Sequence, residues 1–192
     1  MQKLQVQKII IPKQFEQSEN YKKFLNIVKE NKIKIHVVEI GQKINIEKDI
    51  YFDILWPNSE KPISENAINN NSLVCKMVYR NFSCIFTGDI EKVAEEEILK
   101  QYKDGNKLKA NVLKVAHHGS KSSSIEEFIN AVKPKIALIG VGKNNTFSHP
   151  NESVLKRIEK QGCKIYRTDL NGQITIEVNK KGKMRINKML KY

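Results

Sequence analysis

Apolar residues recur along the chain with two spacings, one typical of helices and the other of strands. In residues 18–31, Tyr21, Phe24, Leu25 and Val28 share one face of a predicted helix. Short apolar runs predict strands at 6–11, 33–38, 51–56, 72–79 and 82–87, and alternating apolar residues at Ile44 and Ile46 lead to the strand at 51–56. The Arg80-Asn81 pair between the last two runs predicts a hairpin, and the polar stretch 58–71 predicts a loop.

From residue 90 onward the pattern predicts helices that alternate with strands. The helices are expected at 90–102, 124–132 and 152–161, and the strands between them at 112–115 and 136–140. Ser124 followed by Glu127 has the spacing of a helix capping box. A final hairpin is expected to join 164–168 to 173–178 through a turn at 169–172. Strands with helices between them need helices packed on a sheet face, so the class is α/β or α+β.

The charge is lopsided, with 34 Lys and Arg against 21 Asp and Glu and a formal net charge of +13. A field of this sign attracts polyanions such as nucleic acid. The chain is also rich in Asn and Ile and has far more Lys than Arg, which fits an AT-rich coding bias equally well. The apolar runs are too short to cross a bilayer, and no secretion leader is recognised.

The three cysteines give no sign of a metal site. Cys75, Cys84 and Cys163 are odd in number, lie in apolar surroundings and form no CxxC pair. We therefore expect buried, reduced thiols.

Polar side chains that can hold metals follow three of the predicted strands. Asp89 follows one strand, His117 and His118 follow the next, and His149 lies in the loop after a third. Strand ends of this kind meet at one edge of a sheet, where ligands bind. A carboxylate and imidazoles are ligands that Zn²⁺ accepts. Taken singly, Asp89 is better explained as a helix N-cap and each histidine as an ordinary loop residue.

The histidines of the chain are concentrated at these strand ends. His36 falls inside a predicted strand and is interpreted as structural, whereas the other three follow strands. Successive residues of an extended chain point to opposite sides, so we expect only one of His117 and His118 to face a given metal. The other is expected to contact substrate or to support the ligands.

Five motifs occur in an order that matches a known family. They are NNNSLV (69–74), FTGD (86–89), LKVAHHGS (113–120), SHP (148–150) and YRTDLNG (166–172). Together they resemble the metallo-β-lactamase domain of ComEC-type DNA-internalisation competence proteins, over residues 6–178. The resemblance implies an α+β fold, the αββα sandwich, with two divalent metals (Zn²⁺ or Mn²⁺) between its sheets. Residues 179–192 are expected to form a basic tail.

The resemblance also implies roles for individual residues. Asp89 looks like the carboxylate that bridges the two metals, and His118 looks like a ligand of one of them. His117 and His149 are then expected to act on the substrate or the leaving group, with metal ligation by either as the alternative. Substrate-binding or loop-shaping roles fall to Asn71, Ser72 and Ser120.

One part of the family pattern is absent from this sequence. The leading motif, HxDxDH or HxHxDH, is expected upstream of Val6 and does not occur. We therefore expect a domain that is incomplete at its N-terminus, with too few ligands for Zn²⁺, which takes four. Such a chain is expected to hold fewer metals or none, and to be weak or inactive by itself.

The reaction implied is hydrolysis of a phosphodiester by metal-activated water, with single-stranded DNA as the expected partner. In a competence channel the domain would lie on the extracytoplasmic face of a bacterial membrane. The alternatives are a surface phosphodiesterase or phosphocholine esterase of the same fold, a non-catalytic DNA-binding module, and a structural fragment completed by another chain.

Overall fold

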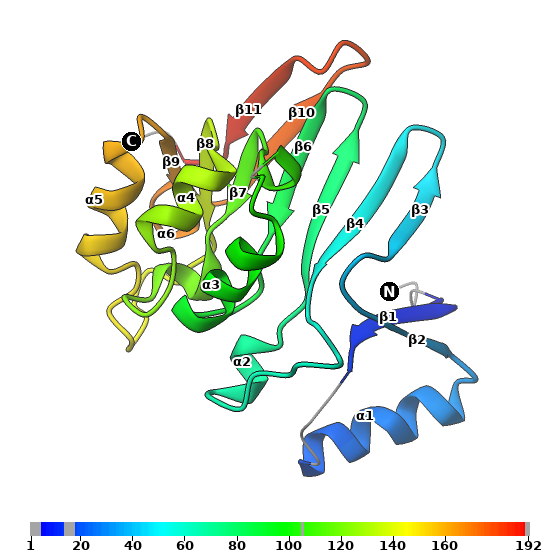
Figure 1. Cartoon of the computed structure of the whole chain (residues 1–192). Coiled ribbons are helices and arrows are strands. Elements are labelled where there is room, and N and C mark those ends of the chain that lie inside the picture. The colour runs from blue at the N-terminus through cyan, green and yellow to red at the C-terminus, as the bar shows by residue number, and fades with distance from the viewer. Residues whose placement is uncertain (1–4, 14–17, 105, 191–192) are drawn as a thin grey trace.

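A seven-stranded mixed sheet forms the centre of the computed structural model, which describes residues 5–13, 18–104 and 106–190 (Figure 1). Its strands lie in sequence order and are β3 (Lys43–Glu47), β4 (Ile50–Trp56), β5 (Val74–Tyr79), β6 (Phe82–Phe86), β7 (Val112–Lys114), β8 (Ile136–Ile139) and β9 (Lys164–Arg167). The pairs from β3 to β6 are antiparallel, and those from β6 to β9 are parallel. The predicted hairpin at Arg80-Asn81 joins β5 to β6.

Helices α3 (Lys92–Gln101), α4 (Glu126–Val132) and α5 (Glu152–Lys160) lie together on one face of this sheet (Figure 1). Apolar residues of the sheet and of α3 and α4 form one buried cluster, which includes Leu55, Ile85, Ala94, Ile98 and Phe128. A second cluster buries Val154 and Ile158 of α5 against the sheet. The helical spacing of apolar residues in the sequence therefore corresponds to the faces that these helices bury against the sheet.

The opposite face of the sheet is covered by a hairpin of β10 (Ile174–Val178) and β11 (Met184–Lys188). The expected pairing of 164–168 with 173–178 is wrong, because β9 pairs in parallel with β8 and Thr168–Asn171 forms the short helix α6. Gly172, at φ +63°, ends that turn. Tyr166 and Ile176 pack in one cluster on this face. Burial of this apolar surface therefore outweighs the local turn residues, which favoured pairing of 164–168 with 173–178. The expected basic tail contains β11.

A β-α-β unit precedes the main sheet and lies beside β3 and β4 (Figure 1). Strands β1 (Lys8–Pro12) and β2 (Lys34–Val38) pair in parallel, with α1 (Glu19–Glu30) between them. Ser18 caps α1 by accepting a hydrogen bond from Tyr21 N at 3.2 Å, so the helix predicted at 18–31 is confirmed. The stretch expected as a loop at 58–71 contains one further helix, α2 (Ala67–Asn70). Within the described ranges, no helix is long and apolar enough to cross a bilayer.

The start of α4 differs from the predicted capping box. Ser124 has a left-handed φ of +57° and precedes the N-cap residue Ile125, and its side chain makes no cap hydrogen bond. Glu95 of α3 instead accepts hydrogen bonds from Ser124 N at 2.6 Å and Ile125 N at 2.8 Å. Burial raises the pKa of Glu95 to about 7, although these two bonds and Arg157 act in the opposite direction. A buried carboxyl group from another helix therefore replaces the local cap.

The three cysteines are free thiols, as expected. Cys84 and Cys163 are buried, and Cys75 is half-buried. Burial raises the pKa of Cys75 and Cys163 to about 11 and that of Cys84 to about 12. These thiols therefore stay protonated near neutral pH, the state of inert core residues.

Candidate functional site

The residues predicted to hold metal or to act in catalysis lie at the carboxyl ends of three neighbouring parallel strands. Asp89 follows β6, His117 and His118 follow β7 in the short turn η2 (Ala116–Gly119), and His149 lies in the loop after β8. Thr87 ties the first two strand ends together by donating a hydrogen bond to Lys114 O at 2.7 Å. The edge of the sheet thus gathers the predicted groups, as the strand pattern indicated.

Asp89 and His118 face each other across this edge, with Oδ1 and Nε2 3.8 Å apart. The other ring nitrogen of His118, Nδ1, is 2.6 Å from Gly140 O. A carbonyl can only accept, so Nδ1 carries a proton, and Nε2 is the ring nitrogen that faces the carboxylate. Metal-binding histidines are oriented in this manner by a backbone carbonyl.

The N-cap explanation of Asp89 does not hold in the structure. The residue at the N-cap of α3 is Glu91, two positions later. Asp89 instead has a half-exposed side chain near two cationic or potentially cationic groups, His118 and Lys114. Its carboxylate is therefore directed to the site and not to the helix.

Lys114 is a component that the sequence reasoning missed. Its Nζ donates to Gly88 O at 3.0 Å and lies 3.9 Å from Asp89 Oδ1. Burial lowers the pKa of Lys114, and the charge of Asp89 raises it in part. The available signal was its place within LKVAHHGS, at the end of the strand that leads to the histidine pair. A half-buried ammonium at this point offers positive charge to an anionic substrate.

The histidine pair sits in an unusual backbone conformation. His117 and His118 have φ values of +46° and +54°, so the chain here is left-handed and not extended as expected. His117 N donates to Gly88 O at 3.2 Å, and His117 O accepts from Ser120 N at 2.8 Å, which holds the turn. The two rings still face different partners: His118 faces Asp89, and His117 faces Glu91.

His117 and His149 form a second cluster beside the first. Their ring centroids are 5.8 Å apart in an edge-to-face arrangement. His117 Nδ1 lies 3.4 Å from Glu91 Oε1 without the alignment of a hydrogen bond, and neither His117 nor His149 has a partner for its buried Nδ1 among the described residues. Burial lowers the pKa of His149, and the neighbouring histidines lower it further. Unpaired buried nitrogens of this kind mark sites that accept a ligand, a water or an ion.

Glu91 was also missed by the sequence reasoning, although it follows Asp89 by only two residues. It accepts hydrogen bonds from Ser122 Oγ at 3.0 Å and Asn66 Nδ2 at 2.8 Å, and its own N–H donates to Asn70 Oδ1. Glu91 thereby connects His117 to the loop after η2 and to helix α2.

Asn71, Ser72 and Ser120 support the loops of the site. The buried Asn71 side chain donates to Ile63 O and Ala67 O and accepts from Ile63 N. Ser72 packs under Gly88, where an added Cβ would lie 2.7 Å from Ser72 Cβ. Ser120 Oγ lies 3.0 Å from Ser122 Oγ. These contacts fit loop-shaping roles, and direct contact with a substrate stays a prediction.

The loops that carry His118 and His149 are packed against each other. Gly119 has a φ of +81°, and a Cβ at this position would lie 2.6 Å from Pro150 Cβ. Asn151 N donates to Gly119 O at 2.8 Å across the same contact. Only glycine therefore allows the two histidine loops to approach this closely.

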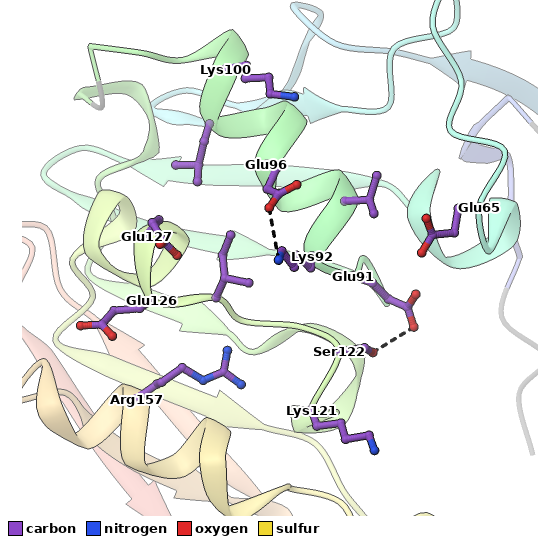
Figure 2. Close-up of a pocket in the computed structure, with 13 residues that line it drawn as sticks. Glu65, Glu91, Lys92, Glu96, Lys100, Lys121, Ser122, Glu126, Glu127 and Arg157 are labelled. Atoms are coloured by element: carbon purple, nitrogen blue, oxygen red, sulfur yellow. Dashed lines mark hydrogen bonds and ion pairs between the residues drawn. The ribbon is translucent and has the colours of Figure 1, made fainter.

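Two cavities adjoin the site. The larger, of about 730 Å³, lies beside α3 and α4 and is lined by five glutamates and four cationic side chains (Figure 2). Glu91 and Ser122 stand at its edge, joined by their hydrogen bond. The smaller, of about 340 Å³, is lined by His118, His149 and residues of the loop after β8.

The described residues fit a metal only in part. Among residues 5–13, 18–104 and 106–190, no group of three or more His, Cys, Asp and Glu is arranged to hold a metal. Asp89 and His118 are a matched pair, because two ligands of one Zn²⁺ each lie about 2.0–2.2 Å from the ion and so can be nearly 4 Å apart.

Proteins with the same sequence pattern are known. ComE operon protein 3 of Bacillus subtilis is 40% identical over 169 residues, which cover 88% of this chain and 21% of that protein. Competence protein ComA of Neisseria gonorrhoeae is 35% identical over 131 residues, which cover 68% of this chain and 18% of that protein. The chain is homologous to these competence proteins over most of its length. It spans about a fifth of their length.

The ComEC-type resemblance is thereby confirmed at the level of homology. No family model matches the chain. Among solved structures, CmlA, a diiron β-hydroxylase from Streptomyces venezuelae, aligns with a TM-score of 0.55 at 10% identity and covers 83% of this chain and 38% of CmlA. At this identity the likeness concerns the fold alone. The fold class is thus a mixed α/β arrangement around the seven-stranded sheet.

Proposed function

We propose that this chain is a metal-dependent phosphodiesterase domain of the metallo-β-lactamase αββα type, acting on single-stranded DNA in DNA uptake. The observation that carries the proposal is the pair of Asp89 Oδ1 and His118 Nε2, 3.8 Å apart, with the His118 tautomer fixed by Gly140 O. Homology to competence proteins supports the DNA-uptake setting. The net charge of +13 supports an anionic substrate.

Asp89 and His118 are the residues that would hold a divalent metal, Zn²⁺ or Mn²⁺. A metal bound there would lower the pKa of a coordinated water towards neutrality and so provide a nucleophile for hydrolysis. Two protein ligands are fewer than the four that Zn²⁺ usually takes. We therefore expect weak metal binding and low activity from these 192 residues alone.

The other groups of the site have separate tasks in this proposal. His117 and His149, whose rings lie edge to face with centroids 5.8 Å apart beside Asp89 and His118, are the candidates to give a proton to the leaving oxygen. Lys114, 3.9 Å from Asp89, offsets negative charge that develops on the phosphate. Asn71, Ser72 and Ser120 hold the loops that surround the substrate.

A cleavage assay tests the proposal. Labelled single-stranded DNA is incubated with the chain and Mn²⁺ or Zn²⁺, and the products are separated by length. Cleavage should require metal and should be lost in Asp89→Asn and His118→Ala, whereas His36→Ala, an exposed histidine of β2, should behave as wild type. Metal-dependent cleavage that survives in Asp89→Asn would contradict the assignment.

The same preparation separates the alternatives. Hydrolysis of a choline phosphate ester without DNA cleavage would favour a phosphocholine esterase. Salt-sensitive DNA binding that is unaffected by a chelator, with no cleavage, would favour a binding module.

A further inference from the structure

A hollow of about 340 Å³ lies beside the histidines, and an exposed aromatic ring forms part of its wall. The ring is that of Phe147, with 75% of its surface exposed. It stacks on His149, with centroids 5.9 Å apart and planes inclined by 25°. Small-ligand pockets have volumes of roughly 300–1,000 Å³, so the hollow is at the small end of that range.

The loop that presents Phe147 is fixed by its own hydrogen bonds. Asn145 Nδ2 donates to Gly142 O at 3.1 Å and His149 O at 2.8 Å, and Asn145 Oδ1 accepts from His149 N at 2.9 Å. Thr168 holds the start of the loop through Val141 N and Val141 O. The ring is therefore presented on an ordered loop, so little conformational freedom would be lost when a ligand stacks on it.

The hollow is open and has no acidic wall. Gly140 and Gly142 lie in its lining, and a Cβ added at either would meet nothing within 4 Å. The lining residues that the structure describes include no acid, and the exposed Lys143 adds a positive charge to the same loop. The larger cavity differs, because its five glutamates offset its four cationic side chains and leave it without net positive charge to attract a polyanion (Figure 2).

We propose that Phe147 and this hollow bind an unpaired nucleobase next to the candidate site at Asp89 and His118. His118 lines the hollow and also faces Asp89, so a base seated there adjoins the candidate site. Aromatic rings stack on bases without regard to sequence, and only an unpaired strand leaves a base free to stack. The inference rests on the proposed function, since the substrate phosphate must occupy the site, and it specifies single-stranded nucleic acid.

Fluorescence anisotropy tests this inference with the 192-residue chain. The probes are a short oligothymidine and a strand of equal length in which stable tetrahydrofuran spacers replace the nucleosides, both at one salt concentration. Wild type should bind the oligothymidine roughly tenfold more tightly than the spacer strand, as expected for one stacked base. Phe147→Ala should abolish the preference, and Phe147→Trp should retain it.

Ile46→Ala is the matched control, because Ile46 is also exposed but lies on β3. It should keep the wild-type preference. An unchanged preference in Phe147→Ala would overturn the inference, as would equal binding of both strands by wild type. Metal-dependent cleavage by wild type, compared with Asp89→Asn, tests the proposed function separately. Metal-dependent cleavage that survives in Asp89→Asn, together with a Phe147-dependent preference, would overturn only the proposed function.

Discussion

Asp89 and His118 belong to neighbouring strand ends, and their Oδ1 and Nε2 atoms approach to 3.8 Å with the histidine proton held on the far side by Gly140 O. A carboxylate oxygen and an imidazole nitrogen at this distance attract each other when a proton or a cation lies between them. Lys114, 3.9 Å from Asp89, supplies part of that positive charge. Asp89 Oδ1 and His118 Nε2 are thus oriented so that a cation could bind between them.

Replacing His118 with Ala should weaken Mn²⁺ or Zn²⁺ binding by at least about tenfold, because changes even to groups that only support ligands cost this much. Isothermal titration of the metal into the chain measures the change. His36→Ala should titrate as wild type does, since that side chain lies exposed on β2. Equal metal affinities for wild type, His118→Ala and His36→Ala would contradict a ligand role for His118.

Gly119→Ala should lower the free energy of unfolding by roughly 1–3 kcal/mol, because the new Cβ combines a left-handed backbone with overpacking. The clash is with Pro150 Cβ at 2.6 Å. Urea unfolding measures the loss. Gly41→Ala is the control, since Gly41 shares a positive φ of +87° but has open space around it. A loss equal to that of Gly41→Ala would show that the loop contact contributes nothing.

Glu95→Ala should destabilise the fold by roughly 1–3 kcal/mol, the cost of leaving buried donors unpaired. Both Ser124 N and Ile125 N would lose their acceptor. The neighbouring Glu96→Ala removes only a surface ion pair with Lys92, at 3.7 Å, and should change stability by a few tenths of a kcal/mol. Similar urea midpoints for the two variants would contradict the capping role of Glu95.

The stability of the fold should also depend on pH through Glu95. Burial raises its pKa from 4.5 to about 7, so the folded state retains a proton that the unfolded state releases. This contribution to stability is fully present below about pH 4.5 and is lost as the pH rises through 7.

Urea midpoints measured between pH 4.5 and pH 8 test this linkage. Glu95→Gln cannot titrate at this position. As the pH rises, the free energy of unfolding of wild type should therefore fall relative to that of the variant. Parallel pH profiles for the two proteins would refute the linkage.

The sequence predicts the arrangement of the site better than its local contacts. Strand ends meet at one edge because neighbouring parallel strands run the same way, so Asp89 and His118 could be placed together from the pattern alone. Glu95 could not be foreseen as the cap of α4, since it lies on another helix, 29 residues before Ser124. The local Ser-x-x-Glu pattern predicts capping by Ser124, but the buried carboxyl group of Glu95 accepts hydrogen bonds from two N–H groups at once and caps the helix in its place.

The same limit explains the final hairpin and the backbone of His117. The turn residues at 169–172 favoured a hairpin between the segments on either side of them. In the structure, Tyr166 is buried with β9 in the main sheet, and α6 leads the chain to the opposite face of that sheet. The left-handed turn at His117 is held by a hydrogen bond to Gly88 O, which lies at the end of another strand. A contact between such distant residues cannot be predicted from the local sequence.

The contact of Gly119 with Pro150 makes the two histidine loops one mechanical unit. A change that widens the first loop must push the second, so His149 cannot shift independently of the turn that presents His118. A smaller side chain at position 150 should not rescue a larger residue at 119, because every residue but glycine keeps the Cβ that clashes and the left-handed backbone of Gly119 stays strained.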